Sequence, residues 1–328
     1  MQAGVTGSRT LSWTGAQRKR FDSLITARLR KAQKRDNWHN ALYLAVDYGV
    51  IAAAIAAAEL TGSLVVHALA LVAIASRMRA LNNLVHEASH KLLFAHPRLN
   101  RWAGMMLCAF PIATSMHAYR RSHGRHHRLL GDPIYDPDRV RYRELGVEDL
   151  PLPRGQVARR FLRMLLLVEI PTYLKGTLRP FVRDSETPRS ETVALWAYWI
   201  GVATVLTLTG AWLGFLLYWV LPFLTVFQML RYCAEISEHG GLYDKEDPLE
   251  LARNNVPHPI IRAIVYPHND NLHLVHHLFP GIPHYRLPLA HRILQADADY
   301  ARAHHCYGYF LPRRDGRPST FAEMTAAA

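Results

Sequence analysis

The stretch ALYLAVDYGVIAAAIAAAELTGSLVVHALALVAIAS, residues 41–76, decides the architecture of this chain. It contains no Lys or Arg, and its apolar character continues well beyond the length of one buried helix. A membrane crossing takes about 20 residues, so the stretch is long enough for two crossings. The sequence ELTGS at 59–63 interrupts it, and we predict helices over 41–59 and 64–82 on either side of this turn.

A second window without Lys or Arg covers residues 190–230 and is interrupted by LTGA at 208–211. We predict helices over 192–209 and 212–231 in this window. All 39 basic residues of the chain lie outside the two windows. The sequence therefore predicts an all-α integral membrane protein. Four transmembrane helices would form two hairpins, and a cytoplasmic helical cap would be built from the remaining segments.

The charge of the chain follows the same division. Its 328 residues include 39 Lys and Arg against 26 Asp and Glu, a net charge of +13. In a soluble protein this excess would indicate a nucleic-acid partner. Here the two predicted outer turns carry no cation, and cytoplasmic loops of membrane proteins are enriched in Lys and Arg. We therefore expect both termini and the 83–190 loop to face the cytoplasm, and we expect no nucleic-acid partner.

The N-terminal residues 1–40 are expected to form a basic cytoplasmic segment. Between residues 18 and 35, apolar side chains recur near helical spacing among cations. This pattern fits either a helix on anionic headgroups or a solvated basic arm. No apolar core follows before residue 41, so a cleaved signal peptide is not predicted. The three cysteines show no CxxC spacing, as expected for a reducing compartment. The Ala- and Arg-rich composition favours a bacterial inner membrane.

Histidines gather in three short clusters, HEASH at 86–90, HGRHH at 123–127 and HLVHH at 273–277. Residues three or four apart lie on one face of a helix, so each cluster directs two or three imidazoles towards one point. Eight imidazoles are too many for one ion. No cysteine joins a cluster, which argues against structural zinc. The pattern predicts a site for two metal ions, and iron is the metal that suits activation of dioxygen.

The clusters are expected to lie together on one side of the membrane. The predicted second helix has no breaker before His86, which lies about 13 Å beyond Arg77 at about 1.5 Å per residue. The fourth helix similarly reaches His239 before two glycines end it. The apolar stretches 102–116 and 159–175 are too short or too charged to cross, and we expect each to be an interfacial or re-entrant helix at the membrane. This placement indicates a lipid-soluble substrate.

In these clusters and their surroundings the chain resembles the membrane fatty acid desaturase superfamily, over residues 77–292 and the four-helix frame. Three clusters in this order and at these separations are highly specific to that superfamily. Further short motifs carry the resemblance. They are Phe94, Asp132-Pro133, Asp136-Pro137, the run NDNLHLVHHLFP at 269–280, and Pro283, Tyr285, Leu287, Pro288 and His291.

The resemblance implies that nine histidines ligate two iron ions, with O2 as co-substrate. The ninth ligand is expected just past the last membrane helix, where this chain has a histidine. The implied ligands are His86, His90, His123, His126, His127, His239, His273, His276 and His277.

The chain departs from the acyl-CoA desaturases of the superfamily at two places. Those enzymes have an Asn four residues before the ninth histidine, and here that position is Glu235. The first cluster is also one residue shorter, as in acyl-lipid and sphingolipid desaturases or carotenoid hydroxylases. His273 stands where the front-end desaturases have Gln, which argues against that branch.

Ligating imidazoles usually donate their second ring N–H to a carboxylate or a carbonyl. Glu235, Glu238 and Asn269 are our candidates for catalytic residues next to the metal ligands. Asn269 is alternatively placed to cap the helix that follows it. Further candidate carboxylates around the ligands are Glu87, Asp132, Asp136 and Asp270.

Together these features predict an oxidoreductase, an O2-dependent di-iron desaturase that introduces a double bond into a lipid-linked or carrier-linked fatty acyl chain. Electrons would come from an external donor of the ferredoxin or cytochrome b5 type with its reductase, attracted by the basic surface. The alternative is a hydroxylase of the same superfamily that acts on a fatty acyl chain, a sphingolipid or a carotenoid. A zinc-binding transporter would instead place its ligands within the membrane spans. We expect the desaturase-like domain over 41–306, followed by a tail over 307–328.

Overall fold

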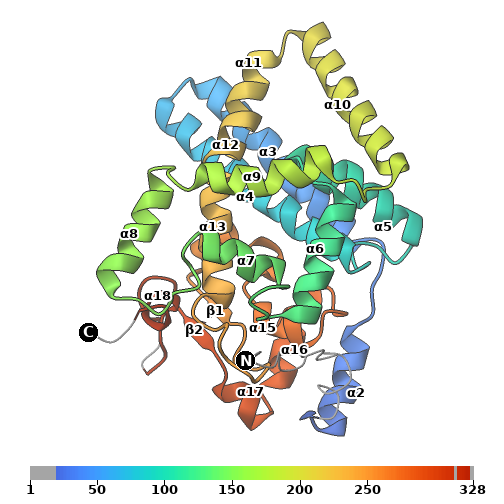
Figure 1. The fold of residues 1–328 in the computed structure, drawn as a ribbon. Coiled ribbons are helices and arrows are strands. Elements are labelled where there is room, and N and C mark those ends of the chain that lie inside the picture. The colour runs from blue at the N-terminus through green and yellow to red at the C-terminus, as the bar shows by residue number, and fades with distance from the viewer. Residues whose placement is uncertain (1–19, 314–315, 326–328) are drawn as a thin grey trace, which may run out of the picture.

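The computed structural model describes residues 20–313 and 316–325, and these are mostly helical (Figure 1). Among the described residues, four helical paths are long and apolar enough to cross a membrane, as predicted. These paths are α3 (His39–Thr61), α4 (Leu64–Ser89), α10 (Arg189–Thr209) and Trp212–His239, which comprises α11 to α13. In Figure 1, α10 and α11 stand at the top of the view, and α2 and α17 lie at the bottom.

Glycines form the turns from α3 to α4 and from α10 to α11. Gly62 ends α3 with a φ of 59°, and Gly210 ends α10 with a φ of 70°, both in the left-handed region that favours glycine. Both glycines lie in the interruptions predicted from the sequence. Large apolar side chains next to these turns are exposed, Leu60 at 87% and Leu208 at 81%. An exposed apolar surface of this extent indicates contact with something other than water.

The fourth path is not one regular helix. Its sections are α11 (Trp212–Phe215), the π-helical turn η3 (Leu216–Val220), α12 (Leu221–Leu224) and α13 (Val226–His239). The irregularity begins with the π-helical turn, Pro222 follows it, and Thr225, with a φ of −122° and a ψ of −92°, breaks the helical backbone before α13. Beyond the break α13 continues past the predicted limit at residue 231 and ends at His239, as expected from the glycines that follow.

Helix α4 lies at the centre of the molecule. It contacts α3, α12, α13, α6 and the irregular segment after α5. The apolar side chains of its last turns, from Leu81 to Ala88, are fully buried in the main core. The helix therefore continues past Arg77 as predicted, but protein rather than lipid surrounds its end. It carries His86 in its last turn and has His90 as its C-cap.

The stretch 102–116 forms no further membrane-length helix, in agreement with the prediction. It consists of the end of α5 (Pro97–Ala103), the π-helical segment η1 (Gly104–Ala109) and the 3-10 turn η2 (Phe110–Ile112). Most of its side chains are buried against α4. A Cβ at Gly104 would lie only 2.7 Å from the Cβ of Ala88, so glycine is what permits this close packing.

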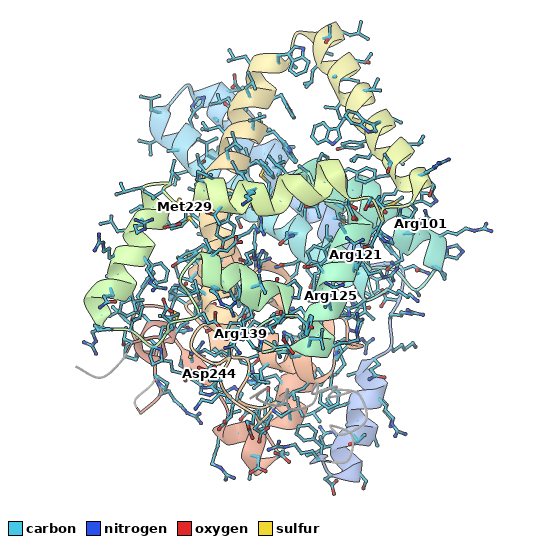
Figure 2. All side chains as sticks on the ribbon, viewed as in Figure 1. Arg101, Arg121, Arg125, Arg139, Met229 and Asp244 are labelled. Carbon is cyan, nitrogen blue, oxygen red and sulfur yellow. The ribbon has the colours of Figure 1, made fainter. Side chains whose placement is uncertain are left out.

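The remaining elements surround the ends of α4 and α13, and α9 crosses the middle of the view in Figure 1. The helices are α6 (Met116–Leu129), α7 (Pro137–Glu144), α8 (Arg154–Leu165), α9 (Ile170–Arg183), α14 (Pro259–Val265), α15 (His273–Leu278), α16 (Leu287–Leu294), α17 (Ala298–Arg302) and α18 (Thr320–Glu323). The strands β1 (Asn254–Val256) and β2 (His305–Tyr307) pair in parallel. Arg139 on α7 forms an ion pair at 3.0 Å with Asp244, which follows α13 (Figure 2).

The N-terminal helix α2 (Ser23–Ala32) does not rest on headgroups through its apolar face. Phe21, Ile25 and Leu29 are buried in a core that also contains residues of α15 and α16. The ring of Phe21 lies 5.7 Å from that of Phe279. Among the apolar side chains of Phe21, Leu24, Ile25 and Leu29, only that of Leu24 is exposed. Both expectations for this basic stretch, an interfacial helix and a solvated arm, are therefore wrong for its apolar side. Residues 1–19 lie outside the described part of the chain.

Glu323→Gln is expected to lower the free energy of unfolding by about 3–5 kcal/mol, because it removes the carboxylate from a buried ion pair. The guanidinium of Arg253, buried to 1% exposure, donates from Nε to Glu323 at 2.6 Å and from a terminal nitrogen to the Gly240 carbonyl at 2.7 Å. The backbone of Arg253 also bonds to Glu238 and Leu274, so this pair connects the end of α13 to α15. Glu144→Gln, on an exposed glutamate, should change the stability by less than about 0.5 kcal/mol.

The same pair gives the stability a dependence on pH. Burial opposes the charge of Glu323, but His304 and Arg253 outweigh it and hold the pKa of Glu323 at about 2, below its ordinary value of 4.5. A carboxyl group with a lowered pKa contributes its stabilisation fully above the unfolded value and loses it as the pH falls towards the folded value. Thermal unfolding should thus show a smaller difference in stability between the wild type and the Glu323→Gln protein at pH 3 than at pH 7. A difference that grows at low pH would contradict this account.

Candidate metal centre

Four helices bring all nine of the predicted histidines together. They come from the end of α4, one face of α6, the end of α13, and α15. Their ring nitrogens form two groups, and within each group the nitrogens lie no more than 4.8 Å apart. The first group is His86, His90, His123, His127 and His276, and the second is His126, His239, His273 and His277.

Nε2 atoms face one another at short distances in both groups. In the five-histidine group, the Nε2 of His276 lies 2.9 Å from those of His86 and His127. The Nε2 of His123 lies 2.9 Å from those of His90 and His127. In the four-histidine group, the Nε2 of His273 lies 2.9 Å from those of His239 and His277. The fourth member, His126, has its ring centroid 5.0 Å from that of His239.

Hydrogen bonding between the rings does not account for this convergence. A neutral imidazole nitrogen either carries one hydrogen or offers one lone pair, so each Nε2 satisfies a single neighbour. The five nitrogens of the first group form a chain with four contacts at 2.9 Å. At most two of those contacts are hydrogen bonds at one time. Five lone pairs directed at a common ion satisfy all the nitrogens together.

The spacing also fits metal ligation. Two ligand atoms at right angles around an ion are separated by the bond length multiplied by the square root of two. A separation of 2.9 Å then corresponds to a bond of about 2.05 Å, within the about 2.0–2.1 Å of metal–imidazole bonds. The residues present therefore fit two metal ions, one for each group. Neither group includes any of the three cysteines.

Burial keeps the imidazoles in the protonation state that ligation requires. Loss of hydration, followed by repulsion from neighbouring rings, holds the pKa of His123, His127, His276 and His277 well below the ordinary value. These rings are therefore neutral near pH 7 and offer a lone pair.

Two further contacts fix the orientation of ligand rings. The Nδ1 of His126 lies 2.9 Å from the Oδ1 of Asp136. Burial opposes a charge on His126, but Asp136 and Asp138 outweigh it and raise the pKa of His126 to about 9, so near pH 7 this ring must release its Nε2 proton when a metal ion binds, while its Nδ1 N–H stays with Asp136. The Nδ1 of His239 donates to the carbonyl of Leu251 at 2.7 Å. Both contacts occupy Nδ1, which leaves Nε2 to face the metal group.

Asp136→Asn is expected to weaken metal binding in the four-histidine group about 10- to 100-fold. The amide of Asn has no negative charge to stabilise the His126 N–H. When the amide is turned over, so that its oxygen and nitrogen exchange places, it presents its NH2 group, a donor, to the Nδ1 of His126 in place of an acceptor oxygen. Competition with a chelator, followed by metal analysis, measures the affinity of each site. The control is Asp132→Asn, since Asp132 accepts only backbone N–H groups of its own turn in the described structure. Equal metal retention in both variants would contradict this role of Asp136.

The three candidate catalytic residues lie in different environments. The Oε2 of Glu238 is 3.7 Å from the Nε2 of His273, next to the four-histidine group. Glu235 instead accepts a hydrogen bond from Tyr173 at 2.9 Å and pairs with Arg141 and Arg231 at 3.2 and 3.4 Å. It belongs to neither histidine group.

Asn269 does not cap the helix that follows it. Its side chain donates to the carbonyl of His284 at 3.1 Å. The N-cap of α15 is Leu272, without a side-chain cap, so the capping prediction is wrong. Asn269 has a φ of 59°, and its carbonyl accepts the Leu272 N–H in the turn before α15. Its contribution is to shape the turn that presents the third cluster.

Arg79 is a neighbour of the site that the sequence analysis did not identify. Its guanidinium contacts Asp270 closely and lies 3.6 Å from Glu238. The side chain is only 7% exposed. A signal was present in the sequence, because Arg79 lies two helical turns before His86 and therefore on the same face of α4.

A cavity of about 190 Å³ opens beside both metal groups. His86 and His123 of the first group line it, together with His126, His239 and His273 of the second. Glu235, Glu238 and Arg79 also line it. A reacting molecule in this cavity would lie next to ligands of both ions.

Comparison with known proteins agrees with this arrangement. A model of the fatty acid desaturase family matches residues 61–309. The chain is 32% identical over 299 residues to the dihydrorhizobitoxine desaturase of Bradyrhizobium elkanii, covering 88% of this chain and 85% of that protein. It is 26% identical to the chloroplastic omega-3 fatty acid desaturase of Brassica napus, over 77% of this chain and 67% of the other. It is 25% identical to the chloroplastic sn-2 acyl-lipid omega-3 desaturase (ferredoxin) of Arabidopsis thaliana, over 77% and 60%.

Proposed function

The chain belongs to the fatty acid desaturase family and is thus an oxidoreductase, and on this premise we propose that it is an O2-dependent membrane desaturase with two iron ions. The observation that carries the proposal is the division of nine buried or half-buried imidazoles into groups of five and four. Imidazole is a good ligand for iron, and no thiolate joins either group. When bound, an iron pair supplies the redox chemistry by which dioxygen oxidises an unactivated C–H bond.

The protein's own residues hold and enclose this site. The nine histidines are the proposed ligands, and Asp136 and the Leu251 carbonyl orient two of them. The cavity beside them positions one pair of neighbouring carbons, since small displacements change which C–H bond reacts. Burial of the ligand rings keeps bulk water away from the ions. Glu238, next to His273, is placed to receive or return a proton at its Oε2.

We propose desaturation of a fatty acyl substrate as the outcome. The relatives named above are all desaturases, which favours loss of a second hydrogen over insertion of oxygen. Expression in a host that supplies a ferredoxin and its reductase, followed by mass spectrometry of lipids and small metabolites, tests this. The expected product has two hydrogens fewer than its substrate and depends on O2. A product with one added oxygen would identify a hydroxylase instead.

The topology we propose follows from the four membrane-length helices. We propose that α3 with α4 and α10 with α11–α13 form two membrane hairpins, and that the cap with the metal centre and both termini lies on the cytoplasmic side. The charge asymmetry of the sequence supports this orientation. Residues 41–306 would then form the desaturase-like domain of a multi-pass protein of the bacterial inner membrane, with residues 1–40 before it and 307–328 after it.

Electrons would come from an external ferredoxin or cytochrome b5 type carrier. The net charge of +13 favours an acidic partner. We therefore expect the association rate between the carrier and the membrane-embedded protein to fall at least about 10-fold when ionic strength rises from 0.01 to 0.15 M, as screening shortens from about 30 to 8 Å. Stopped-flow reduction measures the rate. A rate that does not respond to salt would contradict electrostatic steering.

A further inference from the structure

The cavity beside the metal groups is lined by charged rather than aliphatic side chains. Of the described residues that line it, none is Leu, Ile, Val or Met. Phe227 and Ala118 are its few apolar contributions besides the tyrosines. The charged residues in its lining are Arg79, Arg141, Arg231, Asp138, Glu235, Glu238 and Asp270.

Such a lining does not suit the middle of an alkyl chain. Burial of a methylene gains about 0.8 kcal/mol only where the surroundings are apolar. An alkyl chain that fills a charged cavity removes water from the charges and offers them no hydrogen bonds, at a cost of several kcal/mol. The cavity is also smaller than the about 300–1,000 Å³ of sites for drug-sized ligands. The part of the substrate that enters it is therefore short and polar.

The arginines in the lining are not fully paired within the protein. Arg141 and Arg231 share the carboxylate of Glu235, at 3.2 and 3.4 Å. Arg141 also contacts Asp138 at 3.3 Å. Each guanidinium carries five N–H groups, and among the described residues the Nε of Arg79, Arg141 and Arg231 has no acceptor. These N–H groups without an acceptor indicate a ligand that brings acceptor atoms.

A second cavity lies next to the first. It has a volume of about 440 Å³ and is lined in part by Phe181, Leu195, Trp196 and Trp199, the last three on α10. Ser115 lines both spaces. An amphiphile therefore has a polar place beside the metal ligands and an apolar place next to a membrane-length helix.

We propose, on the basis of the proposed function, that the substrate is an amphiphile whose anionic end binds at Arg141 and Arg231, so that the bond oxidised lies a few bonds from that end. The distance is short because Arg141 and Arg231 line the same cavity of about 190 Å³ as histidines of both metal groups. The apolar remainder of the molecule occupies the second cavity, next to α10.

Binding to the iron-loaded protein without reductant tests this independently of turnover. The probes are decanoate, decyl phosphate and methyl decanoate, which share a tail and differ in the head. Calorimetry should show at least about 10-fold tighter binding of an anion than of the ester. The anion that binds more tightly shows whether the anionic end of the substrate is a carboxylate or a phosphate. Equal binding of all three would overturn the proposal.

Variants locate the preference. Arg141→Met and Arg231→Met should each lower the affinity for the anions by about 10-fold and change the affinity for the ester little. Arg141→Lys should keep part of the preference for the anions. Arg163→Met is the control, because Arg163 pairs with Glu169 away from the cavity and should retain the full preference. Should Arg141→Met not fold, Arg231→Met decides alone.

The position of the double bond separates this inference from the proposed function. A double bond within a few carbons of the anionic end supports both. A double bond far along the chain, or in a neutral lipid, overturns the inference and leaves the desaturase intact. A metal-loaded, reduced protein that forms no double bond in any substrate counts against the proposed function, while the binding preference still decides the inference.

Discussion

His276→Ala is expected to lower product formation at least about 100-fold, a larger effect than that of losing an orienting neighbour of a ligand. The Nε2 of His276 lies 2.9 Å from the Nε2 atoms of both His86 and His127, so it links α15 to α4 and α6 within the five-histidine group. Its removal opens this group and leaves the four-histidine group complete. Turnover and iron content, measured on the same preparation, should fall together.

The control for this prediction is His258→Asn. His258 is exposed, caps α14 through its side chain and belongs to neither group, and Asn retains a capping acceptor. It should keep full activity and full iron content. A His276→Ala protein that retains both would show that the five histidines do not act as a metal site.

Removal of iron by a chelator is expected to abolish activity, and reloading with Fe2+ should restore it. Zinc binds imidazole well but does not change its oxidation state, so zinc loading should restore folding without restoring product. Product analysis with thermal unfolding of the iron, zinc and metal-free forms provides the measurement. The metal-free form should unfold at the lowest temperature, since its lone pairs converge without an ion.

An active zinc form would contradict the redox role of the centre. It would favour instead a zinc site without redox chemistry. Unchanged unfolding temperatures among the three forms would further show that the groups do not bind metal tightly.

The membrane helices were predictable because their signal is local. Cation-free windows and two interruptions determined where helices begin and end, and Gly62 and Gly210 occupy those interruptions. The break at Thr225 was missed, although Pro222, three residues before it, is a local signal for an irregular helix. The packing of Phe21 and Leu29 also required knowledge of a distant partner, Phe279 and its neighbours.

The nine histidines were recognisable from their spacing, but their division between two groups was not. His123 and His127 are four residues apart and belong to the group that contains His86 and His90. His126, which lies between them in sequence, faces His239 and His277. The rotation of α6 about its axis decides this assignment, and packing with α4 and α13 sets that rotation. The spacing of the histidines predicts which face of a helix they share, but it does not predict which histidines of other helices they meet.

The charged lining of the cavity was missed for a related reason. Arg79 and Arg231 stand at the ends of apolar windows, where cations usually mark the membrane boundary. The proximity of Arg79 to Glu238 appears only once α4 and α13 are packed together. Arg231 and Glu235 lie four residues apart on α13, a spacing that the sequence already contained. A substrate with a polar end is consequently a conclusion from the tertiary structure, whereas the reaction class was accessible from the sequence.

The iron content of the purified, reconstituted protein tests the central claim most directly, because the claim is that far-apart imidazoles hold a pair of ions. Elemental analysis should find two iron ions per chain in the wild type, one for each group of histidines. A single iron per chain, or iron that washes out while zinc remains, would contradict it.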